Sequence, residues 1–179
     1  MPLTKLNSAS VIDRLPTGSV LQVKSFSQSN SASSSPNTDY GWDDIIAPST
    51  SIISLRENSG WVVTGQWLMA SRSSAVSCDI WYKIGASGTW ASFGSHGTSG
   101  GASTGSYGLG TAWDTGSTDL WSGNAHHANT TITASIGSAL YFKGVFRRGG
   151  PGTDTESSGS NVANHDKTNS YLTVMEIKG

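Results

Sequence analysis

Ser170–Ile177 (Ser-Tyr-Leu-Thr-Val-Met-Glu-Ile), close to the end of the chain, is the stretch that decides the fold. It is rich in β-branched and aromatic residues and contains neither Gly nor Pro, so it is predicted to be a strand. Alternation along a strand places Tyr171, Thr173, Met175 and Ile177 on one face and Leu172, Val174 and Glu176 on the other. Exposed apolar surface costs about 25 cal/mol per Å², so this segment is expected to be tied into a sheet.

The expected partner of this last strand is an early one, residues 19–26 (Ser-Val-Leu-Gln-Val-Lys-Ser-Phe). This stretch has the same character and follows the turn signal Pro16-Thr17-Gly18. Pairing the first strand with the last closes a β-sandwich, and the segments between them supply the remaining strands.

Composition agrees with an all-β protein that has long polar loops. The chain has 179 residues, which fits one domain. Hydrophobic residues make up 35% and charged residues 13%, while Gly occurs 22 times and Trp 7 times. Both percentages are below the usual globular averages, yet apolar runs of strand length recur. The chain is therefore neither a typical helical enzyme nor disordered.

Charge and cysteine content exclude several classes of function. The net charge of −1, without a long basic run, argues against nucleic-acid binding. No apolar run is long enough to span a membrane, and the N-terminus lacks the features of a secretory signal. The single cysteine, Cys78, permits neither an intrachain disulfide nor a thiolate metal cluster. If the protein acts outside a cell, we expect release by another route, such as lysis.

About eight strands are expected, in an antiparallel β-sandwich of the jelly-roll type. Two strong strands, residues 61–70 and 75–84, are joined by a short polar connection. In the second, Cys78 falls on the apolar face and is expected in the core, while Asp79, Trp81 and Lys83 fall on the polar face. The other expected strands are residues 45–55, interrupted around Pro48, 89–93, 119–121, 130–135 and Ala139–Arg148. In Ala139–Arg148, one face carries Leu140, Phe142 and Phe146, and the other Tyr141, Lys143 and Arg147.

Residues 1–18 are expected to form an arm outside the sandwich domain of residues 19–179. Residues 6–15 are compatible either with one or two helical turns or with an extended arm. The alternatives are a mobile tail and an arm that docks on another subunit. Docking is favoured because large apolar residues are more frequent in this segment than a solvated tail would carry. The candidate docking residues are Leu3, Leu6, Val11, Ile12 and Leu15.

Residues 86–124 form a Gly- and Ser-rich stretch with scattered aromatics. Exposed aromatic side chains in polar loops suit a surface that binds glycan or protein. The more common role of such side chains is to seal the ends of a sandwich, and that alternative is favoured. The candidate recognition residues are Trp90, Tyr107, Trp113 and Trp121. A second loop, residues 39–44, pairs aromatics with carboxylates and could hold Ca²⁺ or a sugar, although an ordered surface loop is the commoner outcome.

No motif for catalysis is found, so the chain is expected not to be an enzyme and to need no cofactor. There is no nucleophile elbow, phosphate loop or His-Glu-x-x-His sequence. His126 and His127 are adjacent and are interpreted as a solvated loop pair rather than metal ligands. The scattered carboxylates show no spacing typical of a glycosidase, although such pairs are built from distant residues.

The two ends of the chain carry a resemblance to a known group of proteins. The motifs are residues 15–23 (Leu-Pro-Thr-Gly-Ser-Val-Leu-Gln-Val), the Ala139–Phe146 strand and the final Ser170–Ile177 strand. With them, the chain resembles small virion structural proteins of tailed bacteriophages, especially marine ones. The resemblance is weak through residues 86–124. It implies a jelly-roll domain, usually a homotrimer, located on the virion and assembled in the host cytoplasm. It assigns no functional residue.

Three functions remain open at this point. The first is a capsid decoration or cement protein, or a short head fibre, with the arm bound to the major capsid protein. The second is a tail-fibre or receptor-binding tip that contacts tail proteins and recognises host glycan. The third is a lectin-like carbohydrate-binding module. The first is preferred because the chain has no shaft repeats, heptads or long stalk.

Overall fold

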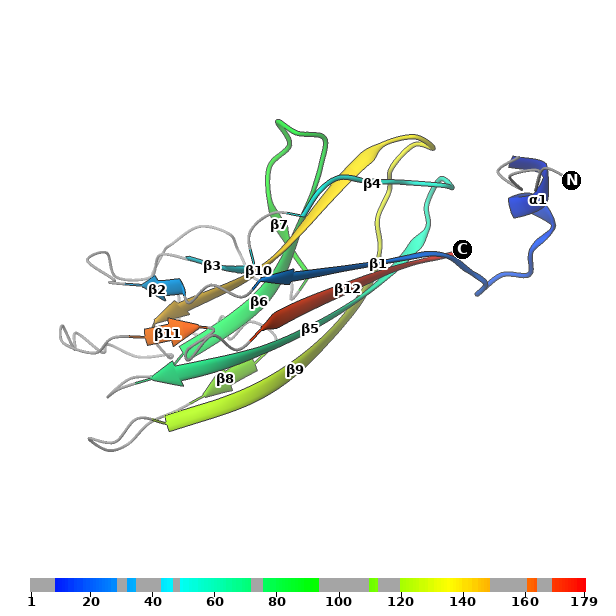
Figure 1. Cartoon of the computed structure of the whole chain (residues 1–179). Helices are drawn as coiled ribbons and strands as arrows, with labels where there is room; N and C mark the ends of the chain where they lie inside the picture. Colours follow the sequence, from blue (N-terminus) through cyan, green and yellow to red (C-terminus); the bar gives the residue numbers. More distant parts are fainter. Residues whose placement is uncertain are drawn as a thin grey trace, which may run out of the picture.

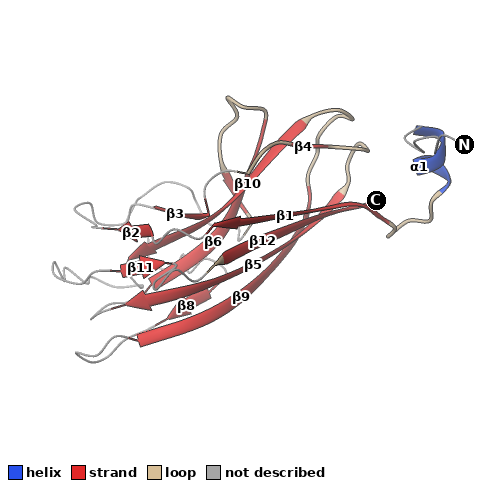
Figure 2. Cartoon of the chain, in the orientation of Figure 1, coloured by secondary structure: helices blue, strands red, loops and turns tan. Residues whose placement is uncertain are grey.

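The computed structural model describes residues 9–28, 32–34, 43–46, 49–71, 76–93, 110–112, 120–148, 161–163 and 169–179. In these residues the chain forms two antiparallel β-sheets in two layers and one short helix (Figures 1 and 2). Apolar residues from both sheets meet in one core between them. The predicted all-β sandwich is therefore confirmed.

Each sheet has six strands. The first sheet, called sheet A, runs β1-β12-β5-β11-β2, with β9 also paired to β5. Its strands are β1 (Val20–Gln28), β2 (Ala32–Ser34), β5 (Gly60–Ser71), β9 (Leu120–Thr131), β11 (Asn161–Ala163) and β12 (Ser170–Ile177). Sheet B runs β3-β10-β6-β7, with β4 paired to β10 and β8 to β6. Its strands are β3 (Asp43–Ile46), β4 (Ile52–Ile53), β6 (Val76–Ile84), β7 (Ala91–Ser92), β8 (Gly110–Ala112) and β10 (Ala139–Arg148). The described residues thus contain twelve strands, several of them very short, where about eight were predicted.

The first and last long strands lie side by side, as predicted. Strand β1 pairs antiparallel with β12, so that Phe26 lies opposite Leu172 and Val20 opposite Ile177. The pairing continues beyond both strands, because the Gly18 amide donates to the Lys178 carbonyl at 2.8 Å. The start of β1 and the end of β12 lie at the end of the sandwich from which helix α1 (Ala9–Arg14) projects (Figure 1).

The prediction was wrong for strand β9, which pairs with β5 at the side opposite β12. Two short strands were expected at residues 119–121 and 130–135, but one strand, β9, spans Leu120–Thr131. Its Gly, Asn, Ala and His residues have low β-propensity, and therefore they read as loop. Twelve consecutive residue pairs with β5 hold it as a strand, which no local pattern reveals. The expected strand at 89–93 is reduced to β7, whereas the interrupted stretch 45–55 is confirmed as β3 and β4.

A buried carboxylate fastens the last strand to the turn between β4 and β5. Glu176 lies on the inner face of β12 with Leu172 and Val174, and its exposed fraction is 0%. Its oxygens accept hydrogen bonds from Gln22 Nε2 (2.6 Å), Ser59 Oγ (2.7 Å), the Leu55 amide (3.0 Å), Ser54 Oγ (3.1 Å) and the Arg56 amide (3.2 Å). A buried charge is tolerated only when hydrogen bonds compensate it, and these donors do so.

Large aromatic side chains dominate the core. Trp61 and Trp67 of β5 and Phe142 of β10 are almost fully buried, and the rings of Trp61 and Phe142 lie 5.5 Å apart. The Trp67 indole folds back over Gly65 of its own strand, where a Cβ atom would lie 2.1 Å from Cζ3 of the ring. Only glycine at position 65 leaves room for this placement.

Cys78 is a core residue, as predicted. Its side chain is fully buried in β6, and burial raises the pKa of the thiol to about 12 from an ordinary value of 9.0. The thiolate is the reactive form, so the native thiol is expected to be inert.

The raised pKa of Cys78 predicts a loss of stability in alkali. Between about pH 9 and 12 the unfolded thiol loses its proton while the folded one keeps it, so the free energy of unfolding falls as pH rises. Urea denaturation at pH 8, 9.5 and 10.5 should show a steeper decline for the wild type than for Cys78→Ala. Equal slopes in the two proteins would contradict this assignment.

Candidate functional site

Helix α1 is held at the end of the sandwich by two cationic side chains of the body. The last carbonyls of a helix have no partner within it, and cations near that end are favourable. Lys178, only 7% exposed, donates from Nζ to the Asp13 carbonyl at 2.9 Å and also to the Leu15 carbonyl. Arg56, in the turn that surrounds Glu176, forms an ion pair with the Asp13 carboxylate. The carboxyl end of the helix is thus fixed to the body.

The structure bears on only part of the predicted docking arm. Of the two conformations considered for residues 6–15, the structure shows the helical one, as α1, and the side chains of Ile12 and Leu15 are half-buried. Val11 lies in α1, but its side chain lies outside the described set, as do Leu3 and Leu6 entirely. Docking on a partner therefore stays a prediction.

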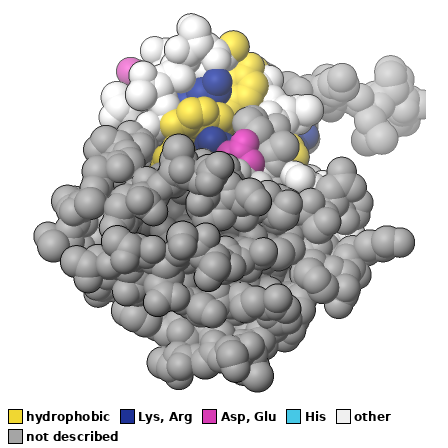
Figure 3. All heavy atoms as spheres, turned by 90° about the vertical axis from the view of Figure 1, so that its left-hand side faces the viewer, with side chains coloured by type: hydrophobic (Ala, Val, Ile, Leu, Met, Phe, Trp, Pro, Cys, Tyr) yellow, Lys and Arg dark blue, Asp and Glu magenta, His cyan; other side chains and the backbone are white. Residues whose placement is uncertain are grey.

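The outer face of sheet B carries lysine side chains packed on aromatic rings. We call Trp81, Lys83, Trp90, Tyr141 and Lys143 the lysine–aromatic surface. Lys83 Nζ lies 5.0 Å from the Trp90 ring centre and 5.3 Å from that of Tyr141. Lys143 Nζ lies 4.7 Å from the same Trp90 ring and 5.1 Å from Trp81. Rings and ammonium groups therefore alternate, a favourable cation–π arrangement. In the upper part of Figure 3, hydrophobic, cationic and acidic side chains lie next to one another on the molecular surface.

Strand register creates this alternation. Lys143 of β10 lies opposite Trp81 of β6, and Tyr141 lies opposite Lys83. Trp90 comes from the segment between β6 and β7, so three separate stretches of chain contribute. Both ammonium groups lie over aromatic rings, and long cationic side chains placed in this way can cover apolar surface with their stems.

Two carboxylates accompany the surface. Asp44 of β3 pairs with Lys143 Nζ at 2.7 Å. Asp79, fully buried, accepts hydrogen bonds from the Ile80 amide at 2.7 Å, from Trp81 Nε1 at 3.1 Å and from Ser92 Oγ. Asp79 and Trp81 were placed on the polar face of β6 from the sequence, yet both side chains are buried. Ser92 of β7 reaches this face and helps to enclose it.

Of the predicted recognition residues, the structure places Trp90 in the lysine–aromatic surface. Trp121 lies in β9, where its side chain is outside the described set, and Tyr107 and Trp113 lie outside it entirely. Trp81 and Tyr141 were not predicted as partners of Trp90. A signal was present, because β6 reads Trp-x-Lys and β10 reads Tyr-x-Lys, each with an aromatic two residues before a lysine.

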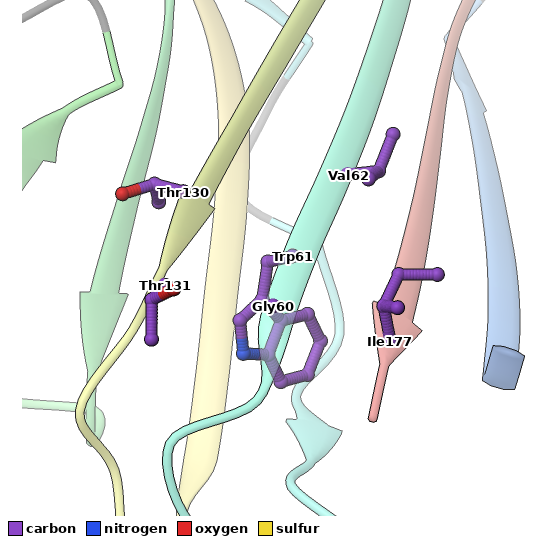
Figure 4. A pocket seen from close by; sticks show the side chains of 6 residues that line it. All are labelled: Gly60, Trp61, Val62, Thr130, Thr131 and Ile177. Atoms are coloured by element: carbon purple, nitrogen blue, oxygen red, sulfur yellow. The ribbon is translucent and has the colours of Figure 1, made fainter. Parts of the chain in front are cut away.

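A shallow groove lies on sheet A where β5, β9 and β12 meet (Figure 4). Its volume is about 330 Å³, and its lining consists of Gly60, Trp61, Val62, Thr130, Thr131 and Ile177. These lining residues include no charged side chain, and the side-chain polar groups among them are the Thr130 and Thr131 hydroxyls and the Trp61 indole N–H.

The histidine pair lies in a strand rather than in the loop that was expected. His126 lies opposite Gly65 and His127 opposite Thr64, both within β9. Within the described ranges, no three His, Cys, Asp or Glu residues cluster as a metal site would require. None of the helical residues that the structure describes forms a long apolar span able to cross a membrane.

Comparison with known proteins assigns no family to this arrangement. No protein-family model matches the chain, and no curated protein matches it significantly.

Proposed function

We propose that this protein is a structural component of the surface of a phage particle, attached to the particle by its N-terminal arm. The preferred form is a capsid decoration or cement protein, or a short head fibre. The observation that carries this proposal is the position of α1, which lies beyond the end of the sandwich where β1 begins and β12 ends (Figure 1). An arm in this position can contact a larger assembly without covering either sheet.

The contacts of Lys178 and Arg56 explain how such an arm would transmit attachment. Lys178 immediately follows β12, and Arg56 belongs to the turn that encloses Glu176. A pull on the helix would therefore load β12 and β5, two neighbouring strands of sheet A, rather than a single flexible linker. Fixed geometry also lowers the entropy lost when the arm binds a partner.

Self-association is a further part of the proposal. The jelly-roll type and the homotrimer come from the resemblance to phage virion proteins. Sheet A offers a surface for subunit contact, because Val20 and Val23 of β1 are both 52% exposed and Tyr171 of β12 is 45% exposed. In the alternative form, the same oligomer sits on the tail and binds tail proteins.

Removal of residues 1–8 tests the attachment. The shortened protein keeps Asp13 and Leu15, so Lys178 and Arg56 retain their partners and the melting temperature should change little. Binding to purified shells, measured by co-sedimentation, should fall at least about tenfold. Removing residues 1–18 is a poorer experiment, because it would also remove the Asp13 and Leu15 carbonyls that accept hydrogen bonds from the Lys178 ammonium group.

The matched control is Leu3→Ser with Leu6→Ser in the full-length chain, which keeps arm length but removes two apolar side chains. It should lose shell binding to a similar degree. If the shortened protein still decorates shells as the wild type does, attachment through residues 1–8 is wrong.

A further inference from the structure

Lys83 is the cation of the lysine–aromatic surface that has no ion pair among the described residues. Lys143 Nζ is paired with Asp44 at 2.7 Å, whereas Lys83 Nζ donates to the Ala86 carbonyl at 2.5 Å. An ammonium group has three donors, so Lys83 keeps donors for an acceptor outside the chain. Its side chain is half-buried and therefore partly open to solvent.

The nearby carboxylates do not neutralise the positive charge of Lys83. Asp44 is engaged by Lys143, and Asp79 is fully buried and accepts bonds from Ile80, Trp81 and Ser92. Both ammonium groups nevertheless lie within about 5 Å of the Trp90 ring centre, where like charges repel. An external anion at Lys83 would relieve this repulsion.

We propose that Lys83, Trp90 and Tyr141 bind an acidic sugar of a polysaccharide. The carboxylate or sulfate would pair with Lys83 Nζ in a charge-assisted hydrogen bond. The half-buried Trp90 and Tyr141 side chains on either side of Lys83 would pack against the C–H groups of the sugar. This inference goes beyond attachment to a particle, because it assigns a ligand to the outer face of sheet B, whereas the arm is fixed to strands of sheet A.

The small number of cations favours a polysaccharide over a nucleic acid. Nucleic-acid binding depends on neutralising several phosphates, and among the side chains that the structure describes only Lys83 and Lys143 contribute cations here, with Lys143 already paired. A single partly exposed ion pair gives weak binding, so useful affinity needs several sites that act together. A polymer with an acidic group on every sugar supplies this when it meets an oligomer of the chain.

Binding to immobilised polysaccharides at low salt tests the proposal without any particle present. The probes are alginate, which carries carboxylates, dextran sulfate, which carries sulfates, and neutral dextran. The wild type is expected to bind one or both acidic polymers and not neutral dextran. Lys83→Met should weaken this binding at least about tenfold, because it keeps the stem and removes the charge.

Two variants serve as controls. Lys24→Met removes an exposed lysine of β1 on the other sheet and should leave binding unchanged. Lys83→Arg keeps the charge and should bind within about threefold of the wild type, which separates loss of charge from loss of fold. The proposal is overturned if Lys83→Met binds like the wild type, if Lys83→Arg loses as much as Lys83→Met, or if neutral dextran binds equally well. Because shells are absent, failure here leaves the attachment proposal standing.

Discussion

Glu176→Ala is expected to lower the free energy of unfolding by about 3–5 kcal/mol. The carboxylate is fully buried and receives five donors from β1 and from the turn between β4 and β5. Removing it leaves these donors facing an empty space from which water is largely excluded. The loss is a large fraction of the 5–15 kcal/mol that typically separates folded from unfolded domains. Urea denaturation followed by tryptophan fluorescence measures it.

Glu176→Gln and Glu57→Ala are the controls for this experiment. The amide of Gln keeps the size but replaces one acceptor oxygen with a donor, so an intermediate loss of about 1–3 kcal/mol is expected. Glu57 is exposed in the same turn, and its removal should change stability by less than about 0.5 kcal/mol. A loss below about 1 kcal/mol for Glu176→Ala would show that the carboxylate does not organise the turn.

Gly65→Ala is expected to cost about 2–3 kcal/mol, although it adds only one methyl group. That methyl would lie 2.1 Å from Cζ3 and 2.5 Å from Cη2 of the Trp67 ring. The ring is only 2% exposed and also lies against Gly144, where a Cβ atom would come within 3.1 Å of Cζ3. The indole therefore has no free direction in which to move. Thermal unfolding and the near-ultraviolet circular dichroism of the tryptophans should both change.

Gly60→Ala is the matched control in the same strand. Its new methyl group would meet Ile177 Cβ at 3.6 Å, an ordinary contact on the outer face of sheet A. Any effect should be small, because the substitution adds no clash and Ala suits a strand slightly better than Gly. If Gly65→Ala is as stable as Gly60→Ala, the packing of Trp67 over Gly65 is not as described.

The strands with regular alternation and β-branched residues could be predicted from the sequence. Ser170–Ile177 matches β12 in both bounds, and the pairing of this strand with β1 followed from the apolar character of both ends. Glu176 was placed on the same face as Leu172 and Val174, so the sequence already signalled a buried carboxylate. Its donors could not be foreseen, because four of them come from a turn more than one hundred residues earlier.

Strand β9 and the lysine–aromatic surface could not be predicted, for a shared physical reason. Each depends on pairing between segments that are distant in the sequence. The weak β-propensity of β9 is overridden by its register with β5, and the contact of Lys143 with Trp81 depends on the register between β10 and β6. Of the residues in this surface, Trp90 alone was named as a candidate from the sequence, because an isolated aromatic in a polar stretch is conspicuous even without its partners.

The most direct test of particle attachment is electron microscopy of phage particles whose genome encodes this chain. The particles are labelled with antibodies against the sandwich domain. The account predicts regular labelling of the particle surface that disappears when residues 1–8 are removed. Label on the shell favours the decoration or head-fibre form, and label on the tail favours the receptor-binding form. Particles without label, with all of the protein free in solution, would contradict the proposed function.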